Sequence, residues 1–329
     1  MGTLLLARSE VAGLLRLDDC IAAVAAAFRA HGEGRARPPG AVGHAVAGGG
    51  FHVKVASLDR GDRGWFVTKT NGNFFDNAER FGLPRIQGVI VLCDATHGTP
   101  LAVMDSIEIT IQRTGAATAV AADHLARADA GVATIVGCGV QGRIQLAALA
   151  RVRRLRQVYA YDTTPGRAER LAAELSPELG VPIAAMADLP AATRRSDLVV
   201  TCTPAREPVL GPTDVAPGAF VAAVGADSEE KQELAPELLA AGAVVVDLLD
   251  QCAAFGDLHH ALAAGVMRRE QVRAELGAVV AGTRPGRLSE DEIVIFDSTG
   301  TALQDVAAAA LVFERALRAG VGTTIDFGA

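Results

Sequence analysis

Residues 132–142, VATIVGCGVQG, contain the most specific structural motif of the chain. Its first half is a run of small and branched apolar residues, which predicts a buried strand, and a helical pattern follows at once. The three glycines have the spacing G-x-G-x-x-G. The first permits a tight turn, the second lets the backbone approach a pyrophosphate, and the third lets the helix meet the strand. The stretch predicts a dinucleotide-binding turn with contacts from Gly137, Gly139 and Gly142.

An acidic residue stands where a dinucleotide site needs one. The next apolar run, residues 157–162, ends at Asp162, about 20 residues beyond the last glycine. Its carboxylate can accept hydrogen bonds from the adenosine ribose hydroxyls and would repel a 2′-phosphate, which favours NAD over NADP. The alternative is a glycine-rich turn with a purely structural role, but the strand, the helix and the acid together favour the dinucleotide. Because the same fold also serves methyl transfer, the motif alone does not identify a reaction.

Further buried strands are predicted after the glycine motif. Apolar runs rich in Val, Ala and Leu occupy residues 197–203, 219–225 and 243–249, with helical segments between most of them. Such runs are typical of strands buried on both faces, so we expect an α/β fold with a Rossmann-type doubly wound parallel sheet. Residues 51–105 instead contain short β runs separated by turns, which predict an antiparallel sheet, followed by a long helix over 106–127. At 329 residues the chain exceeds the usual size of one hydrophobic core, which predicts two domains.

Composition argues against several classes of partner. The formal charge is −7, aromatic residues make up 4% and no basic run exceeds a pair, so nucleic acid is not an expected partner. No apolar run approaches the roughly 20 residues of a membrane helix, and no membrane partner is expected. The five cysteines show neither a CxxC pair nor zinc-ligand spacing, so no metal site is predicted. We expect no targeting signal from the first residues, and these features together predict a cytoplasmic protein with reduced thiols.

Four segments resemble the ornithine cyclodeaminase and mu-crystallin family. They occur in the family's order and span nearly the whole chain: VTKTNGN (67–73), IQRTGAAT (111–118), VGAD (224–227) and FDSTGTALQD (296–305). The resemblance implies an NAD-binding domain at 115–299 that is inserted into a second domain, residues 1–114 with 300–329. That β-rich second domain would bind the substrate and form a homodimer.

The same resemblance assigns the chemistry to a few side chains. Arg113 and Arg37 would bind the substrate carboxylate, a task that suits the planar donors of a guanidinium. Lys69 would polarise the carboxylate or imine and handle a proton, and Asp227 would be the acid or base for the substrate nitrogen. Three of these residues have an alternative interpretation. Arg113 would have a solvated or capping role, Lys69 a solvated strand-face position, and Asp227 the role of a helix N-cap.

Further cofactor contacts follow from matching positions in the family. They lie in the glycine turn, at later strand ends and shortly after them: Val140, Gln141, Thr203, Val224, Gly225, Ala226, Lys231 and Ser298. For Thr203 the alternative is a strand-end hydroxyl that is satisfied within the protein.

Two positions depart from the pattern of a cyclodeaminase. Relatives that act on diamino acids carry a Glu in the first long strand, where this chain has FHVKVA at 51–56. Strand alternation places His52 and Lys54 on one face, so Lys54 either enters the substrate pocket and repels a distal ammonium or lies on a solvated face. Arg85 replaces a small hydroxyl residue that touches the cofactor in relatives, and its alternative is surface exposure. If Lys54 and Arg85 join the other cations, an acidic substrate is favoured.

These observations predict an NAD-dependent imine reductase or amino-acid dehydrogenase that acts on the Cα–N bond of a small amino or imino acid. The resemblance leaves two other functions open. One is an ornithine or lysine cyclodeaminase, an ammonia-lyase in which the hydride is withdrawn and then returned. The other is a noncatalytic NAD-dependent ligand-binding protein, against which Lys69, Arg113 and Asp227 argue.

Overall fold

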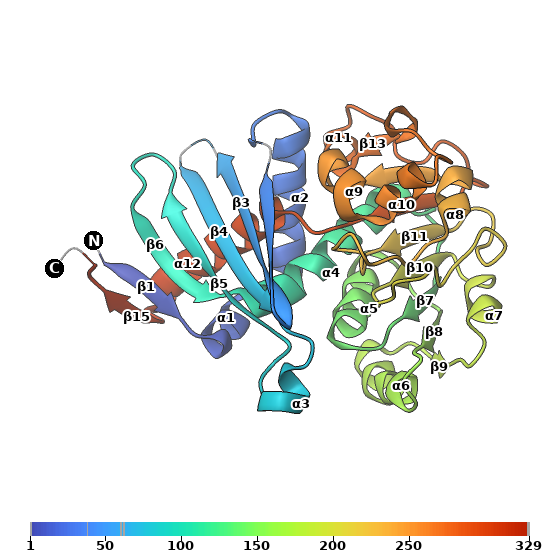
Figure 1. Cartoon of the computed structure of the whole chain (residues 1–329), viewed down its shortest axis with the longest axis horizontal. Helices are drawn as coiled ribbons and strands as arrows, with labels where there is room; N and C mark the ends of the chain where they lie inside the picture. The colour runs from blue at the N-terminus through green and yellow to red at the C-terminus, as the bar shows by residue number, and fades with distance from the viewer. Residues whose placement is uncertain (1, 38, 60, 62, 328–329) are drawn as a thin grey trace. The chain divides into compact units, whose positions relative to one another are not determined.

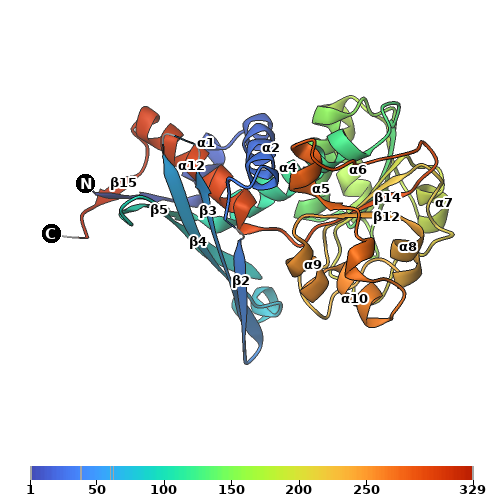
Figure 2. The same ribbon diagram turned by 90° about the horizontal axis from the view of Figure 1, so that it is seen from above.

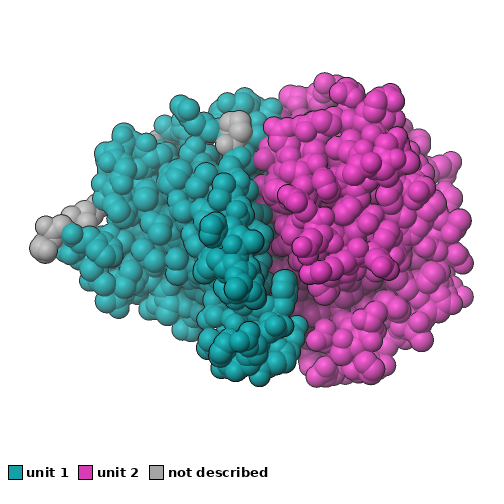
Figure 3. Space-filling view, in the orientation of Figure 1, with its two compact units in different colours: residues 1–113, 301–329 teal, residues 114–300 magenta. Residues whose placement is uncertain are grey.

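Each of two units of the chain is built on its own β-sheet. The computed structural model describes residues 2–37, 39–59, 61 and 63–327. Unit 1 comprises residues 1–113 and 301–329, and unit 2 comprises residues 114–300 (Figure 3). In sequence, unit 2 is therefore an insertion in unit 1.

The sheet of unit 1 is formed by seven strands: β1 (Thr3–Leu6), β2 (Gly40–Val46), β3 (Gly49–Asp59), β4 (Gly64–Asn73), β5 (Ile86–Asp94), β6 (Pro100–Asp105) and β15 (Thr323–Ile325). Their order is β15-β1-β6-β5-β4-β3-β2 (Figure 1). Strands β2 to β6 are successive antiparallel neighbours, and β3 to β6 agree with the short β runs over 51–105. Strand β1 pairs in parallel with β6, so the sheet is mixed at that edge.

Helices cover one face of this sheet. Helix α12 (Ala302–Ala319) contacts β3, β4 and β5, and α2 (Leu17–Gly32) packs against α12. Figure 2 shows both helices on the same side of the strands. The short helix α1 (Arg8–Leu14) contacts β6 and α12, while α3 (Asn77–Phe81) lies in the connection from β4 to β5. Alternate residues of β4 are buried on the helix-covered face: Trp65, Val67, Lys69 and Asn71.

Unit 2 contains a sheet of eight strands: β7 (Val132–Val136), β8 (Gln157–Tyr161), β9 (Ile183–Ala185), β10 (Leu198–Thr201), β11 (Phe220–Ala223), β12 (Ala243–Val246), β13 (Ala274–Glu275) and β14 (Val294–Asp297). Their order is β13-β12-β14-β11-β10-β7-β8-β9, and the strands pair in parallel. The chain runs from β7 to β8 and β9 on one side, then returns with β10 and β11 on the other. This reversal confirms the Rossmann-type doubly wound sheet, and its switch point lies at β7, directly before the glycine motif.

The sheet of unit 2 also contains a central strand that the sequence pattern does not predict. Strand β14 pairs with both β11 and β12, yet its apolar run IVIF at 293–296 is short and lies between charged residues. A run of that length does not separate a strand from a loop by periodicity. The strand predicted over 243–249 ends at Val246, because the chain then turns into helix α9 (Leu249–Phe255).

Helices flank the sheet of unit 2 and complete its core. They are α5 (Val140–Val152), α6 (Arg167–Leu179), α7 (Leu189–Thr193), α8 (Pro236–Ala241), α9, α10 (Asp257–Ala263) and α11 (Leu276–Val280), while α4 (Ser106–Leu125) begins in the sequence of unit 1. Val199, Val221 and Val244 pack from the sheet against Leu238 and Leu258 of the helices. Within the described part of the chain, no helix combines the length and the hydropathy that crossing a membrane requires.

Candidate functional site

The glycine turn of unit 2 has the conformation that a dinucleotide needs. Gly137 has φ +98°, a value that side-chain-bearing residues rarely adopt, and a Cβ on Gly142 would collide with the carbonyl oxygen of Gly137. A Cβ on Gly139 would meet open space, so the backbone there is accessible to a ligand. Helix α5 starts at Val140 and no side chain caps its first turn, which suits an anion at that helix end. The three glycines therefore have the separate geometric roles that the motif predicts.

Asp162 follows β8 and is bonded to the glycine turn. Its Oδ2 accepts a hydrogen bond from the backbone N–H of Cys138 at 2.8 Å, and its Oδ1 accepts one from Thr164 at 2.7 Å. A pocket of about 250 Å³ lies beside the turn, and Arg143, Arg167 and Arg170 are among its lining residues. The predicted ribose acid is thus next to the turn, where ribose hydroxyls would share its oxygens with backbone amides.

The other predicted cofactor residues lie at the carboxyl ends of β10, β11 and β14. Val224, Gly225 and Ala226 follow β11, and Ser298 follows β14, where its hydroxyl donates to Asp247 Oδ2 at 3.0 Å. The Thr203 hydroxyl donates to Glu233 Oε1 at 2.8 Å, so it is satisfied within the protein, as the alternative interpretation holds. In the glycine turn, Val140 is exposed and Gln141 is half-buried.

Asp227 lies in a turn of unit 2 beyond the end of β11. Its carboxylate pairs with Nζ of Lys231 at 2.5 Å, and its side chain is 47% exposed. No helix begins within 227–235, since α8 starts at Pro236, so the N-cap interpretation of Asp227 is wrong. Two predicted functional residues are therefore in direct contact with each other.

Unit 1 contains a buried cluster of charges under α12. Lys69 Nζ lies 2.6 Å from Asp305 Oδ2, and Arg113 Nε donates to Asp305 Oδ1 at 3.0 Å. Arg113 Nη1 also donates to Gln304 Oε1 at 2.8 Å. Strand β4 supplies Lys69, helix α4 supplies Arg113, and the first turn of α12 supplies Gln304 and Asp305. All are buried, so the solvated interpretations of Lys69 and Arg113 are wrong.

Burial and neighbouring charges determine the protonation of this cluster. Burial lowers the pKa of Lys69 to about 7; Asp305 opposes this shift, while the positive charges of Arg113 and Lys54 add to it. Burial alone would raise the pKa of Asp305, but Lys69 and Arg113 beside it hold that pKa below its usual value. The cluster therefore combines a carboxylate that stays ionised, Asp305, with an amine that can exchange its proton near neutral pH, Lys69.

Lys54 belongs to the same buried face. It lies directly opposite Lys69 in the β3–β4 register and is only 8% exposed. The solvated-face interpretation of Lys54 is therefore wrong. The reason is that α12 packs on this face of β3 as well as β4.

Two predicted substrate residues do not reach the cluster. Arg85 precedes β5 and donates through Nη2 to Glu79 Oε1 at 2.6 Å, with more than half of both side chains exposed. Arg37 is exposed between α2 and β2, whereas Lys69 and Arg113 are buried. The predicted convergence of five cations is wrong for Arg85, because the connection that carries it is held at the surface by Glu79.

Two buried acids have positions that the sequence analysis leaves without a role. Asp305 ends the segment FDSTGTALQD, and its position on the buried side of an amphipathic helix is a signal that sequence alone contains. Glu233 of unit 2 accepts hydrogen bonds from the residues after β10 and β11, in a stretch without secondary structure where no local pattern indicates burial.

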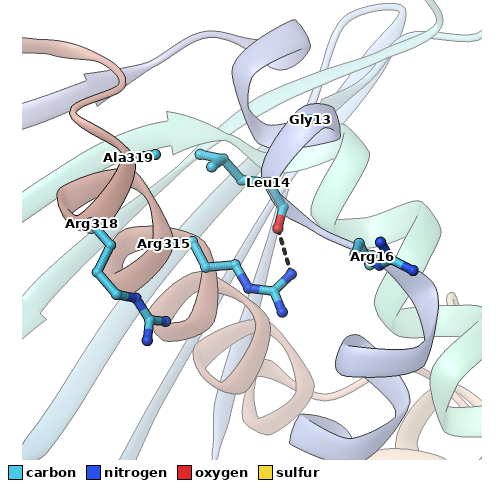
Figure 4. Close-up of a pocket in the computed structure, with 6 residues that line it drawn as sticks. All are labelled: Gly13, Leu14, Arg16, Arg315, Arg318 and Ala319. Carbon is cyan, nitrogen blue, oxygen red and sulfur yellow. Dashed lines mark hydrogen bonds between the residues drawn. The ribbon is translucent and has the colours of Figure 1, made fainter.

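A second pocket in unit 1 lies apart from these residues. It measures about 500 Å³ and is lined by the end of α1 and the last turns of α12, including Leu14, Arg16, Arg315 and Arg318. Figure 4 shows the Arg315 guanidinium turned to the carbonyl oxygen of Leu14, a bond of 2.8 Å, while Arg16 and Arg318 point in other directions. The arginines of this pocket do not converge on one point.

The sequence is similar to known proteins over nearly the whole length of the chain. The sequence model of the ornithine cyclodeaminase/mu-crystallin family matches residues 1–320. An alanine dehydrogenase of Archaeoglobus fulgidus is 38% identical over 327 residues, which are 99% of this chain and 99% of that protein. An iminosuccinate reductase of Paracoccus denitrificans is 34% identical over 331 residues, covering 98% of this chain and 99% of that protein.

Solved structures are similar over both units. An archaeal alanine dehydrogenase dimer with bound NAD has a TM-score of 0.95 at 38% identity, covering 99% of this chain and 100% of that chain. A Thermococcus litoralis Δ1-pyrroline-2-carboxylate reductase in complex with NADH and L-proline has a TM-score of 0.93 at 34% identity, covering 98% and 100%. The Paracoccus iminosuccinate reductase in complex with NAD⁺ has a TM-score of 0.92 at 33% identity, covering 99% and 100%.

Proposed function

Because the chain belongs to the ornithine cyclodeaminase/mu-crystallin family, we propose that it is an NAD-dependent oxidoreductase acting on the Cα–N bond of a small amino or imino acid. The observation that carries the proposal is the buried pair of cations, Lys69 and Arg113, around Asp305. Asp305 supplies one negative charge for these two buried cations, so the cluster has an excess of positive charge in the core of unit 1, which favours a ligand with an anionic group. The glycine turn supports a dinucleotide as the second ligand.

Arg113 would bind the substrate carboxylate. Asp305 and Gln304 fix the plane of its guanidinium through Nε and Nη1, which presets the direction from which a carboxylate can approach. A preset donor loses less freedom when the ligand binds, and it orients the Cα–N bond that reacts. Arg85 has no part in this proposal, because its guanidinium is bound by Glu79 at the surface, and Arg37 remains the predicted second arginine for the carboxylate.

Proton transfer would fall to Lys69 and Asp227. An amine with a pKa of about 7 can give up or regain a proton at neutral pH, so Lys69 can stabilise charge that develops on the imino acid. Asp227 would carry the proton to or from the substrate nitrogen, with Lys231 holding its carboxylate. When bound, NADH would supply a hydride to Cα, and NAD⁺ would accept it in the reverse direction.

The substrate that this site fits has a neutral or acidic side chain. Lys54 adds a positive charge beside Lys69 on the buried face, and this charge would repel the distal ammonium of ornithine or lysine. A second carboxylate would instead be attracted to it. The similarity to an iminosuccinate reductase supports a dicarboxylic imino acid as one candidate.

We also propose that two copies of the chain associate through the open face of the unit 1 sheet. This face carries a row of cross-strand neighbours, Val42, Val53, Thr70 and Val89, and Val89 is 45% exposed. An apolar row of this kind on a monomer marks an interaction surface. Sedimentation should give twice the mass of one chain for the wild type and the mass of one chain for Val89→Lys, whereas Val266→Lys, at a similarly exposed valine of unit 2, should remain dimeric.

The proposed compartment is the cytoplasm. All five cysteines are free, and those at positions 20, 138 and 252 are buried. Free thiols persist where glutathione and thioredoxin keep cysteines reduced.

The test of the function is NADH oxidation with a panel of imino acids. The panel contains pyruvate plus ammonia, oxaloacetate plus ammonia, and Δ1-pyrroline-2-carboxylate, and the loss of NADH absorbance is followed for each. In parallel, ornithine and lysine are incubated with NAD⁺ and released ammonia is measured. Turnover of at least one imino acid is expected. Ammonia release from ornithine or lysine without net change in NADH would identify a cyclodeaminase instead, and NADH binding without any turnover would identify a binding protein.

A further inference from the structure

Glu233 is a fully buried carboxylate that bonds to two loops at once. Its Oε1 accepts the backbone N–H of Thr203 at 2.6 Å and the Thr203 hydroxyl at 2.8 Å. Its Oε2 accepts the backbone N–H of Gly225 at 2.7 Å and the Thr201 hydroxyl at 2.8 Å. Thr201 and Thr203 stand at the end of β10, and Gly225 follows β11. One side chain therefore joins the carboxyl ends of two neighbouring strands.

These two loops lie at the edge of the sheet where parallel α/β folds bind their ligands. Strands β10 and β7 are neighbours, so the loop that contains Thr203 is next to the glycine turn. A Cβ on Gly137 would meet the carbonyl oxygen of Cys202 and the methyl group of Thr203. The position of the Thr203 loop thus limits the space beside the turn in which a dinucleotide would lie.

The Gly225 loop is held equally closely. A Cβ on Gly225 would collide with the carbonyl oxygen of Thr203 and would lie 2.6 Å from the carboxyl carbon of Glu233. Only glycine lets the two loops and the carboxylate approach to this distance. The close approach shows that the contact between the loops is built around Glu233 and is not a loose surface bond.

The backbone of Glu233 is fixed as well. Its N–H donates to Asp257 Oδ1 at 2.8 Å, and its carbonyl oxygen accepts the N–H of Val209 at 2.7 Å. Asp257 also accepts the N–H of Leu234 at 2.9 Å. Because the backbone on both sides of its Cα is fixed, the carboxylate of Glu233 has a fixed position, and so do the groups that it binds.

An apolar residue would fill this position at lower cost if packing were the whole purpose. Burial raises the pKa of the Glu233 carboxyl, which reflects the cost of placing a charge there, and the N–H and O–H donors around it act in the opposite direction. No cation contacts this carboxylate among the described residues; its partners are donors from the two loops. The negative charge of Glu233 is thus stabilised by hydrogen bonds from the two loops.

We propose that Glu233 is the positioning residue of the dinucleotide site, which holds the Thr203 and Gly225 loops at the spacing that the cofactor requires. The inference rests on the proposed NAD-dependent function. Glu233 acts through these loops and does not itself touch the cofactor. Its loss should weaken dinucleotide binding while leaving the cluster of unit 1 unchanged.

The test is NADH affinity of Glu233→Gln, measured by fluorescence titration of the full chain. In either orientation, the amide NH2 would face the backbone N–H of Thr203 or of Gly225, which cannot accept a hydrogen bond, so one of the two loops must move away. The Kd for NADH should rise at least about tenfold, the size of effect that the loss of one hydrogen bond to a charged group can produce. KM for NADH should rise with it, and KM for the imino acid should stay near the wild-type value. Glu237→Gln, an exposed glutamate of α8, is the matched control and should bind NADH as the wild type does.

Thr201→Val keeps the experiment decisive if Glu233→Gln folds poorly. This nearly isosteric change removes one donor to Glu233 at a position buried within the strand, and Kd should rise about threefold. A lower Tm with unchanged NADH affinity in either variant would overturn the inference, because it would assign Glu233 to stability alone. Wild-type protein that does not bind NADH would overturn the proposed function and the inference together.

Discussion

The ammonium nitrogen of Lys69 lies 2.6 Å from Oδ2 of Asp305, whose Oδ1 accepts a hydrogen bond from Arg113. One carboxylate thus holds both cations that the proposed function assigns to the substrate. Burial lowers the pKa of Lys69, Asp305 raises it, and Arg113 and Lys54 lower it, with a balance at about 7. The proton affinity of Lys69 therefore depends on Asp305 being charged and in place.

Replacing Asp305 by Asn should move the pH dependence of the reaction. The variant removes the charge that favours the ammonium form, so the pKa of Lys69 should fall below about 7. If the ammonium is the active form, kcat/KM decreases as pH rises through this pKa, and the decrease should begin at lower pH in the variant. The measurement is kcat/KM for imino acid reduction over roughly pH 5 to 9.

Asp250→Asn is the control for this shift. Asp250 is an exposed carboxylate of unit 2 that pairs with Arg269, so its replacement removes the same charge from a surface position outside the cluster of unit 1. Its pH profile should match that of the wild type. An Asp305→Asn profile with the wild-type midpoint would show that the titrating group is not Lys69.

Asp227→Asn should abolish most turnover without preventing NADH binding. The amide cannot carry the proton, and loss of general acid–base catalysis typically costs a factor of about 10² to 10⁴. The glycine turn and Glu233 are untouched, so the Kd for NADH should change little. Lys231→Gln removes one partner of Asp227, the ammonium at 2.5 Å, but keeps the carboxylate, so it should lose less turnover than Asp227→Asn. Turnover of Asp227→Asn at the wild-type rate would exclude Asp227 as the proton carrier.

Local spacing explains why the nucleotide-binding part of the fold is predictable from sequence. The glycines at 137, 139 and 142 act within one turn, and each geometric role depends on residues close in sequence. Strand β14 is different. Its place between β11 and β12 arises from pairing with strands that end many residues earlier, and a short apolar run carries no sign of that.

The family resemblance points to Lys69 and Arg113, but the contacts within the charged cluster of unit 1 are not predictable from local sequence patterns, for a similar reason. Alternation places Lys54 on one of two faces of β3, and which face is buried depends on α12, near the other end of the chain. The bond from Arg113 to Asp305 spans 192 residues of sequence. Arg85 is wrongly expected in this cluster because its exposure depends on Glu79, whose pairing no periodic pattern encodes.

The wild type should bind NADH more tightly than NADPH, and Asp162→Ser should narrow the difference. Asp162 would repel a 2′-phosphate, whereas the pocket beside it contains Arg143, Arg167 and Arg170, which would attract one once the acid is gone. NADH affinity should also fall in Asp162→Ser, because the bond to the Cys138 amide is lost. Fluorescence titrations with both dinucleotides measure these changes. Adding Arg167→Ala to Asp162→Ser should remove the increase in NADPH affinity that Asp162→Ser produces. Equal affinities of the wild type for NADH and NADPH would refute the role of Asp162.

The side-chain charge of the substrate should depend on Lys54. This residue lies opposite Lys69 on the buried face, so a distal ammonium of the substrate would meet a second cation in a poorly solvated place. At an effective dielectric near 20, two like charges roughly 6 Å apart cost about 3 kcal/mol, a preference on the order of a hundredfold. The kcat/KM for the reduction of neutral and dicarboxylic imino acids should therefore be higher than the kcat/KM for ammonia release from ornithine or lysine.

Lys54→Met and Lys54→Gln separate charge from shape in this prediction. Both variants keep most of the length of the side chain and remove its charge, so both should lower kcat/KM for the iminosuccinate formed from oxaloacetate and ammonia more than for the imine of pyruvate. The pKa of Lys69 should rise at the same time, because the Lys54 charge lowers it. The alkaline decrease in kcat/KM should then move to higher pH, opposite in sign to the change in Asp305→Asn. Equal losses for both imino acids in the two variants would mean that Lys54 supports Lys69 but does not select the substrate.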